Sequence, residues 1–312
     1  MNLTVLTLGL GRGQGASGYA EGLVRGLRAR GHVVHVPELK GRRSLVRSRR
    51  ADGVLVSLER APHADVWRAG GGVHAVAMAA LGKRRPSLDA WLEQRAARTA
   101  RVVVANSTFV ADQLMGRLGV PSARIEVVRT GVDLARFQVA SERSGAVLFA
   151  AHGWTRKGFE VAVRAFAFGA PRTSELWVAG RDARRASRLR WARRMLGGRV
   201  VDLGEGVDLA PVLGRVGAVL HPTRYDAAAN LVLEGLASGV PVVTSVMDGS
   251  AEIVPDPGLV ALDPMDADGV AACLRRALDS ADPAPWRAAA ERWPESRNHS
   301  QMEVVATRCV NG

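Results

Sequence analysis

The sequence is poor in several residue types on which whole classes of protein depend. Only two cysteines occur in 312 residues, Cys273 and Cys309, and neither has a second ligand at metal-binding spacing, which disfavours a disulfide scaffold and a structural zinc site. Aromatic residues make up 5% and do not interleave with basic ones, which disfavours a surface that stacks nucleic-acid bases. No apolar run reaches the roughly 18 residues of a membrane-spanning helix, so we expect a globular protein.

The charge balance is the strongest feature of the composition. There are 43 basic and 30 acidic residues, a net charge of +13, which favours an anionic substrate, anionic lipid or nucleic acid as partner. The low aromatic content makes nucleic acid the weakest of the three. Residues 1–8 have no basic leader and run into glycines, so we predict a first strand there and not a signal peptide. With so few cysteines, we expect a cytoplasmic protein.

Apolar runs of strand length alternate with helical patterns in two successive sets. The runs are residues 3–8, 32–36, 53–57, 66–69, 101–105, 124–129, 145–151, 175–180, 199–203, 217–220, 240–244 and 259–262. This alternation predicts an α/β fold with two Rossmann-like, doubly wound parallel sheets, whose strand carboxyl ends face a cleft. A polar stretch near residue 140 marks the boundary. We therefore predict an N-terminal domain over 1–140, a C-terminal domain over 141–290 and a tail over 291–312 that returns to the first domain.

One stretch, residues 220–244, combines a strand, a polar turn, a short helix and another strand. We predict that Asn230 caps the helix. The free amides of Ala229, Asn230 and Leu231 would then point out of the helix start and favour an anion such as a diphosphate.

Two acidic residues flank the start of the same helix, Asp226 before it and Glu234 inside its first turns. Carboxylates accept hydrogen bonds from hydroxyls, so this pair could bind sugar hydroxyls on either side of one phosphate. The alternative is a turn residue and a solvated helix face, the usual environment of such residues.

A second anion site is indicated by Arg156 and Lys157, which directly precede another predicted helix. Cations at a helix N-terminus oppose the helix dipole unless an anion is bound there. Two exposed charges are the alternative. Arg181, at the carboxyl end of the next strand, is a further candidate for nucleotide binding.

The first half of the chain contains a glycine-rich loop before its first helix. The spacing Gly13-x-Gly15-x-x-Gly18 formally matches a dinucleotide fingerprint, but Gly13 lies too far beyond the strand that ends near Leu8. What the pattern does predict is a loop whose amides approach a ligand closely, with Gly13 and Gly15 in contact.

Two further features of the first half have open interpretations. His74 follows a glycine triplet after a strand, which is typical of a ligand-binding loop, but a structural histidine with a hydrogen-bonded ring fits equally well. Residues 40–50 hold a dense basic run that is either a solvated loop or a contact with anionic lipid headgroups.

Together these motifs resemble the donor-site signature of family 4 retaining glycosyltransferases of the GT-B fold. The signature is an acidic residue, seven others and a Glu, then Gly-x-Pro-Val-Val, and the variant here is similar to the branch of lipopolysaccharide-core glucosyltransferases. Asp226 stands where most members have Glu, and Gly71 replaces an expected acid. By this resemblance Glu234 would hold the ribose hydroxyls, Asp226 the transferred sugar, and Arg156 and Lys157 the donor diphosphate.

The resemblance implies transfer of a hexose from a nucleotide-diphosphate sugar, UDP-sugars being favoured, to a hydroxyl of a glycan or glycolipid. Retention of the anomeric configuration, a role in cell-envelope synthesis and peripheral contact with the inner face of the membrane are implied with it. The implied catalytic set is His74, Arg156, Lys157 and Asp226. We expect no metal or other cofactor, since no acidic pair with metal-binding spacing follows a strand. A non-catalytic nucleotide-sugar-binding relative and a sugar-nucleotide epimerase of the same fold remain alternatives.

Overall fold

The computed structural model describes residues 1–8, 16–39, 41, 44–45, 53–83, 87–140 and 142–311. It divides the chain into two compact units. The first comprises Met1–Gly131 and Glu295–Gly312, and the second comprises Val132–Pro294. The polar stretch near residue 140 therefore lies inside the second unit, and the C-terminal residues from Glu295 belong to the first.

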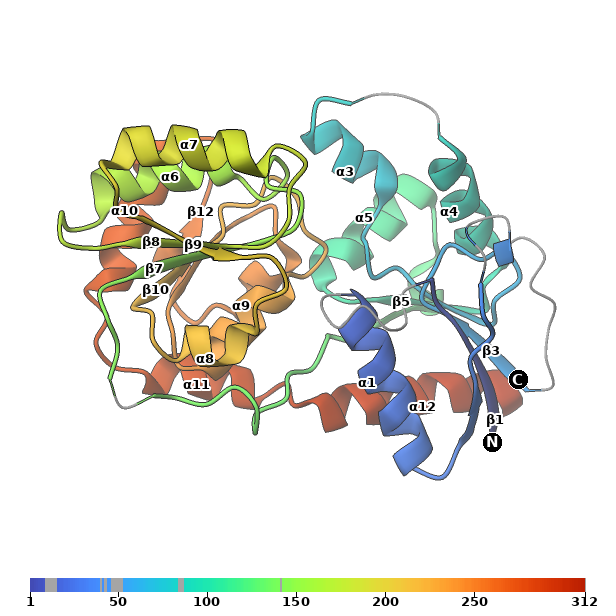
Figure 1. The fold of residues 1–312 in the computed structure, drawn as a ribbon. Helices are drawn as coiled ribbons and strands as arrows, with labels where there is room; N and C mark the ends of the chain where they lie inside the picture. Colours follow the sequence, from blue (N-terminus) through green and yellow to red (C-terminus); the bar gives the residue numbers. More distant parts are fainter. Residues whose placement is uncertain are drawn as a thin grey trace. The chain divides into compact units, whose positions relative to one another are not determined.

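The first unit is built on a parallel sheet that, among the described residues, has six strands in the order β2-β1-β3-β4-β5-β6. The strands are β1 (Asn2–Leu6), β2 (Val33–His35), β3 (Val54–Ser57), β4 (Val66–Arg68), β5 (Val102–Ala105) and β6 (Ile125–Val127). The helices are α1 (Ala16–Ala29), α3 (His74–Ala80), α4 (Leu88–Thr99), α5 (Thr108–Leu118) and α12 (Glu295–Asn311). Figure 1 shows α1 and α12 side by side on one face of this sheet, with α4 and α5 on the other.

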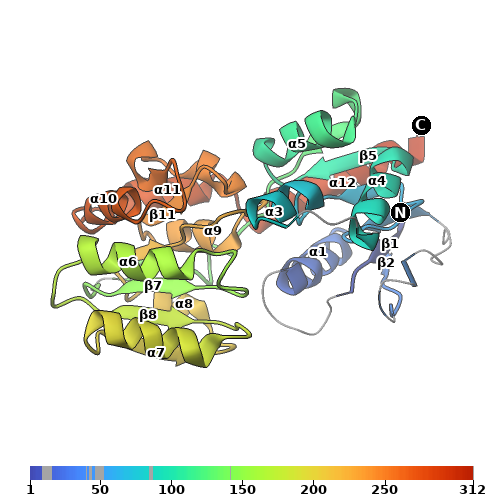
Figure 2. The same ribbon diagram turned by 90° about the horizontal axis from the view of Figure 1, so that it is seen from above.

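The second unit repeats the plan, again with six described strands, in the order β12-β11-β10-β7-β8-β9. The strands are β7 (Val147–Ala150), β8 (Leu176–Ala179), β9 (Val200–Gly204), β10 (Ala218–Leu220), β11 (Val242–Ser245) and β12 (Val260–Ala261). The helices are α6 (Phe159–Gly169), α7 (Arg185–Leu196), α8 (Leu209–Leu213), α9 (Asn230–Ala237), α10 (Ala267–Leu278) and α11 (Ala284–Glu291). Helix α6 packs between α10 and α7 on one face, and Figure 2 shows α6 and α7 alongside each other.

The structure confirms the predicted fold class of two doubly wound parallel sheets. Strands such as β3 and β7 are buried along their whole length, as expected where helices cover both faces of a sheet. Strand ends differ from the sequence-based ones by about two residues at most, the usual uncertainty of element ends. Helix α5 begins at Thr108, where the Ser107 side chain accepts a hydrogen bond from the Val110 amide.

An aromatic cluster fixes the turn that joins β7 to α6. Trp154 stacks on Phe159 with ring centroids 4.4 Å apart and meets Phe149 edge-on at 6.1 Å. The Trp154 indole N–H also donates to the carbonyl of Ala151 at 3.0 Å. The backbone that carries Arg156 is therefore anchored from within the core.

Within the described ranges, no helix has both the length and the apolar character needed to cross a membrane.

Candidate functional site

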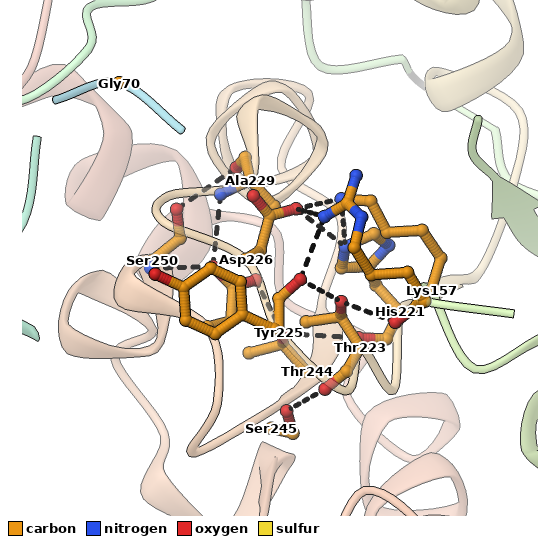
Figure 3. A network of polar contacts seen from close by, with 12 residues as sticks. Gly70, Lys157, His221, Thr223, Tyr225, Asp226, Ala229, Thr244, Ser245 and Ser250 are labelled. Carbon is orange, nitrogen blue, oxygen red and sulfur yellow. Dashed lines mark hydrogen bonds and ion pairs between the residues drawn. The ribbon is translucent and has the colours of Figure 1, made fainter. Parts of the chain in front are cut away.

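Three neighbouring strands of the second unit, β11, β10 and β7, end at one edge of the sheet. The segments that follow them bring together the side chains of a polar network (Figure 3). Arg156 and Lys157 follow β7, Asp226 follows β10 and Asp248 follows β11. The carboxyl edge of a parallel sheet is where α/β proteins bind ligands, so this network is the candidate site.

The centre of the network is the carboxylate of Asp226. The Lys157 ammonium forms an ion pair with Asp226 Oδ2, and Arg156 Nη1 lies 3.7 Å from the same oxygen. His221 Nε2 lies 3.4 Å from Lys157 Nζ and 3.7 Å from Asp226 Oδ2. The structure thus brings together three of the predicted catalytic residues and adds His221, which the sequence analysis did not identify.

The Arg156 turn is held against the segment after β10 by backbone contacts. Arg156 Nη1 donates to the carbonyl of Tyr225 at 2.9 Å, and the carbonyl of Arg156 accepts from the Arg224 amide at 2.8 Å. Gly158, the residue before α6, has a φ of +76°. A Cβ atom there would lie 2.0 Å from the carbonyl oxygen of Pro222, so only glycine lets the two segments approach this closely.

Asp248 is a functional candidate that the sequence analysis passed over. Its side chain is buried and accepts from the amides of Ala229 and Ser250, at 3.1 and 2.9 Å. Its second oxygen accepts from the Thr244 hydroxyl at 2.8 Å. Asp248 therefore fixes the segment that leads into α9. Its position three residues after a strand, before a glycine, was the available signal.

The start of α9 differs from the prediction in two ways. Ala229 occupies the N-cap position and Asn230 is the first helical residue, so Asn230 does not cap the helix. The Ala229 amide is also not free, because it donates to Asp248. The amides of Asn230 and Leu231 stay in the first turn, where helix geometry offers no intrahelical acceptor. The helix start therefore offers an anion fewer free amides than predicted. The buried Asp248 carboxylate takes the place of the cap that was expected from Asn230.

Burial, and after it the crowding of cations, shifts the protonation equilibria of this network. Burial, and then the neighbouring Arg156 guanidinium, lower the pKa of Lys157 to about 7, against the opposing charge of Asp248. Burial, followed by Lys157 and Arg156, holds the pKa of His221 well below its usual range, so this imidazole is neutral. Burial also lowers the pKa of Arg156. An added anion would favour the charged form of each cation, which makes the network suited to binding a phosphate group.

Glu234 lies on α9 near a second ion pair of the same unit. Arg136 Nη2 contacts Asp208 Oδ1 at 2.7 Å, and the charges of both groups shift the pKa of Glu234. Burial is the main cause that raises the pKa of Glu234 to about 7, Arg136 opposing and Asp208 adding to the shift. Hydroxyl groups that donate hydrogen bonds to the Glu234 carboxylate would stabilise its charged form.

This shift predicts a pH-dependent gain in stability for Glu234→Gln. Because the folded pKa is raised from 4.5 to about 7, the wild-type protein loses stability as pH rises from 4.5 to 7. Glutamine has no charge to bury, so we expect it to stabilise the ligand-free protein by about 2 kcal/mol at pH 8 and hardly at all at pH 4.5. Melting temperatures at both pH values measure this. The exposed Glu205→Gln is the control, and an equal gain at both pH values would contradict the burial argument.

Of the other predicted residues of the second unit, Arg181 does not join this network. Arg181 is exposed after β8, and its backbone amide donates to His152 Nδ1 at 3.0 Å. Gly13, Gly15 and most of the basic run 40–50 lie outside the described residues.

His74 belongs to the first unit, where it is the first residue of α3. Its backbone amide donates to Glu93 Oε2 at 2.8 Å, and its ring Nε2 lies 2.9 Å from Ser87 Oγ. Glu93 is almost completely buried, pairs with Arg60 at 3.0 Å, and has its pKa raised by burial. The sequence analysis missed Glu93, whose partners Arg60 and His74 are distant from it in sequence. Among the described residues, no cluster of three or more His, Cys, Asp or Glu side chains could hold a metal ion.

The chain has the GT-B fold: its described parts form two parallel six-stranded sheets with flanking helices. The structure of WaaG, a glycosyltransferase involved in lipopolysaccharide biosynthesis, matches with a TM-score of 0.80 at 17% identity, over 99% of this chain and 100% of that one. Anabaena HepE in complex with UDP-glucose matches with a TM-score of 0.74 at 16% identity, over 99% of this chain and 100% of that one.

Two stretches of the sequence also match known protein families. Residues 144–280 match the family described as glycosyl transferases group 1, and residues 68–136 match Glycosyltransferase Family 4. Glycogen synthase of Mycobacterium tuberculosis is 28% identical over 227 residues, which are 68% of this chain and 53% of that protein. The chain spans about half the length of the curated relatives it matches. The chain is thus similar to these two glycosyltransferase families over separate stretches.

Proposed function

We propose that this chain transfers a hexose from a nucleotide-diphosphate sugar to an acceptor hydroxyl with retention at the anomeric carbon. The observation that supports this most is the meeting of Arg156, Lys157 and Asp226 beside the start of α9. Glu234 lies on the same helix and supplies a carboxylate for the ribose hydroxyls. HepE was solved with UDP and with UDP-glucose, which favours UDP-glucose as the first donor to test.

The catalytic contribution of the network is electrostatic. Breaking the glycosyl–phosphate bond transfers negative charge to the diphosphate, and preorganised cations stabilise that charge as it develops. In our proposal the diphosphate takes the place of Asp226 as the partner of Lys157. Asp226 is then released to accept hydrogen bonds from the transferred sugar.

The acceptor proton needs a base in this scheme. The leaving phosphate oxygen takes it in our proposal, as in the retaining family that the sequence resembles, and His74 orients the donor sugar. WaaG acts in lipopolysaccharide biosynthesis, which supports a glycan or glycolipid of the cell envelope as the acceptor class.

The test is to incubate the full chain with UDP-glucose and follow the sugar by NMR, with and without glycan acceptors. We expect UDP-glucose to raise the melting temperature, since it binds only the folded state, and acceptor-dependent UDP release with an α-linked product. A changed sugar epimer without acceptor would instead identify an epimerase. If no nucleotide sugar raised the melting temperature, the proposal would be wrong.

A non-catalytic nucleotide-sugar-binding role is the second candidate. Two features favour it. Lys157, which is proposed to bind the diphosphate, is already paired with Asp226, and Gly71 stands in place of an acid. This candidate predicts stabilisation by UDP-glucose without release of UDP under any acceptor condition.

A further inference from the structure

A second polar cluster lies at the carboxyl edge of the first unit's sheet. Arg68 ends β4, Asn106 directly follows β5, and Thr130 lies just beyond β6, so neighbouring strands supply all three. Arg68 Nη2 donates to the hydroxyl of Thr130 at 2.9 Å, and Asn106 Nδ2 donates to the carbonyl of Gly70 at 3.2 Å. The residues come from the edge where α/β sheets bind ligands.

Arg68 is the unusual member of the cluster. Only 7% of the residue is exposed, and its guanidinium lies 3.7 Å above the ring of Tyr19. Within the described ranges no carboxylate pairs with it, and its Nε has no hydrogen-bond partner. A buried cation without a counter-charge is costly, because burial removes its hydration.

Two more polar atoms of the cluster share this condition. Asn106 Oδ1 and the Tyr19 hydroxyl are buried and have no partner in the part of the chain that the structure describes. Gly70 lets the guanidinium pack directly against the backbone, because a Cβ there would lie 2.2 Å from Arg68 Nη1. The cluster thus combines an uncompensated cation, an amide oxygen that accepts and a hydroxyl that donates or accepts.

We propose that this cluster binds the oxyanion of the acceptor, a phosphate or carboxylate carried by the glycan or glycolipid. Arg68 pairs with the oxyanion, and Asn106 Oδ1 accepts from a neighbouring sugar hydroxyl. Arginine forms bidentate charge-assisted hydrogen bonds with phosphate and carboxylate alike, which fits either group. This inference rests on the proposed function for the identity of the ligand, but not for the site itself.

The test follows the Arg68 Nε–H resonance in ¹⁵N spectra of the full chain during titration with inorganic phosphate and, separately, with acetate. The resonance is assigned by its proximity to the Tyr19 ring and by its loss in Arg68→Lys. We expect a saturable shift at millimolar concentrations with at least one probe, and the stronger probe identifies the oxyanion. Arg101→Gln, a change at the opposite edge of the same sheet, should keep the response. An unchanged resonance with both probes would overturn the proposal.

A UDP titration of the same sample separates this inference from the proposed function. UDP should perturb the Arg156 resonance in the second unit. If phosphate or acetate shifts Arg68 while UDP binds nowhere, the proposed function fails and the oxyanion site stands. If UDP binds at Arg156 and neither anion shifts Arg68, the site fails and the proposed function stands.

Discussion

Lys157→Met is expected to lower the turnover of the nucleotide sugar roughly a thousandfold, about 4 kcal/mol of transition-state stabilisation. The ammonium group is nearly buried and is held by Asp226 and His221, so solvent cannot replace it when negative charge develops on the diphosphate. Methionine keeps most of the side-chain volume but supplies no charge. The measurement is kcat for UDP release from the donor that stabilises the wild-type protein.

Loss of folding must be separated from loss of chemistry in this variant. Removing Lys157 leaves the Asp226 carboxylate with weaker partners, which destabilises a buried site. The double variant Lys157→Met with Asp226→Asn removes both charges, and we expect it to recover the melting temperature without recovering turnover. Lys83→Met, an exposed change in the first unit, is the control for the loss of a lysine. Turnover within tenfold of wild type in the single variant would rule out the assigned role of Lys157.

Regular features of the sequence predicted the fold, because they depend on local patterns. Continuous apolar runs predicted strands such as β3 and β7. The convergence of Arg156, Lys157 and Asp226 was also foreseeable, since residues that follow parallel strands meet at one edge of the sheet.

Long-range contacts account for what the sequence did not predict. Asn230 has the right chemistry for a cap, but the Asp248 carboxylate from the next strand binds the Ala229 amide and fixes the entry to α9. Local capping rules cannot anticipate such a partner. Glu93 was missed for the same reason: its partners Arg60 and His74 are distant in sequence, and a helix pattern alone does not show them.

Gly158→Ala is expected to destabilise the protein by about 3–5 kcal/mol, a drop of about 10 °C in melting temperature. Two costs combine at this position. The φ of +76° disfavours any side chain by about 1–2 kcal/mol, and the added Cβ would lie 2.0 Å from the carbonyl oxygen of Pro222. The atom in the way is a backbone carbonyl oxygen just beyond β10, which cannot rotate aside. Relief of the clash therefore requires the turn that carries Lys157 to move away from Asp226. We therefore expect donor affinity to fall together with stability.

Gly153→Ala provides a matched control for this prediction. Gly153 lies in the same turn with a φ of +74°, but among the described residues other than its chain neighbours no heavy atom lies within 4 Å of the position its Cβ would take. Alanine there meets only the backbone strain, so we expect a loss of about 1 kcal/mol and little change in donor affinity. Thermal unfolding and UDP-glucose titration of both variants give the comparison. Equal losses in the two variants would mean that strain alone matters, and that close approach of Gly158 to Pro222 does not hold Lys157 beside Asp226.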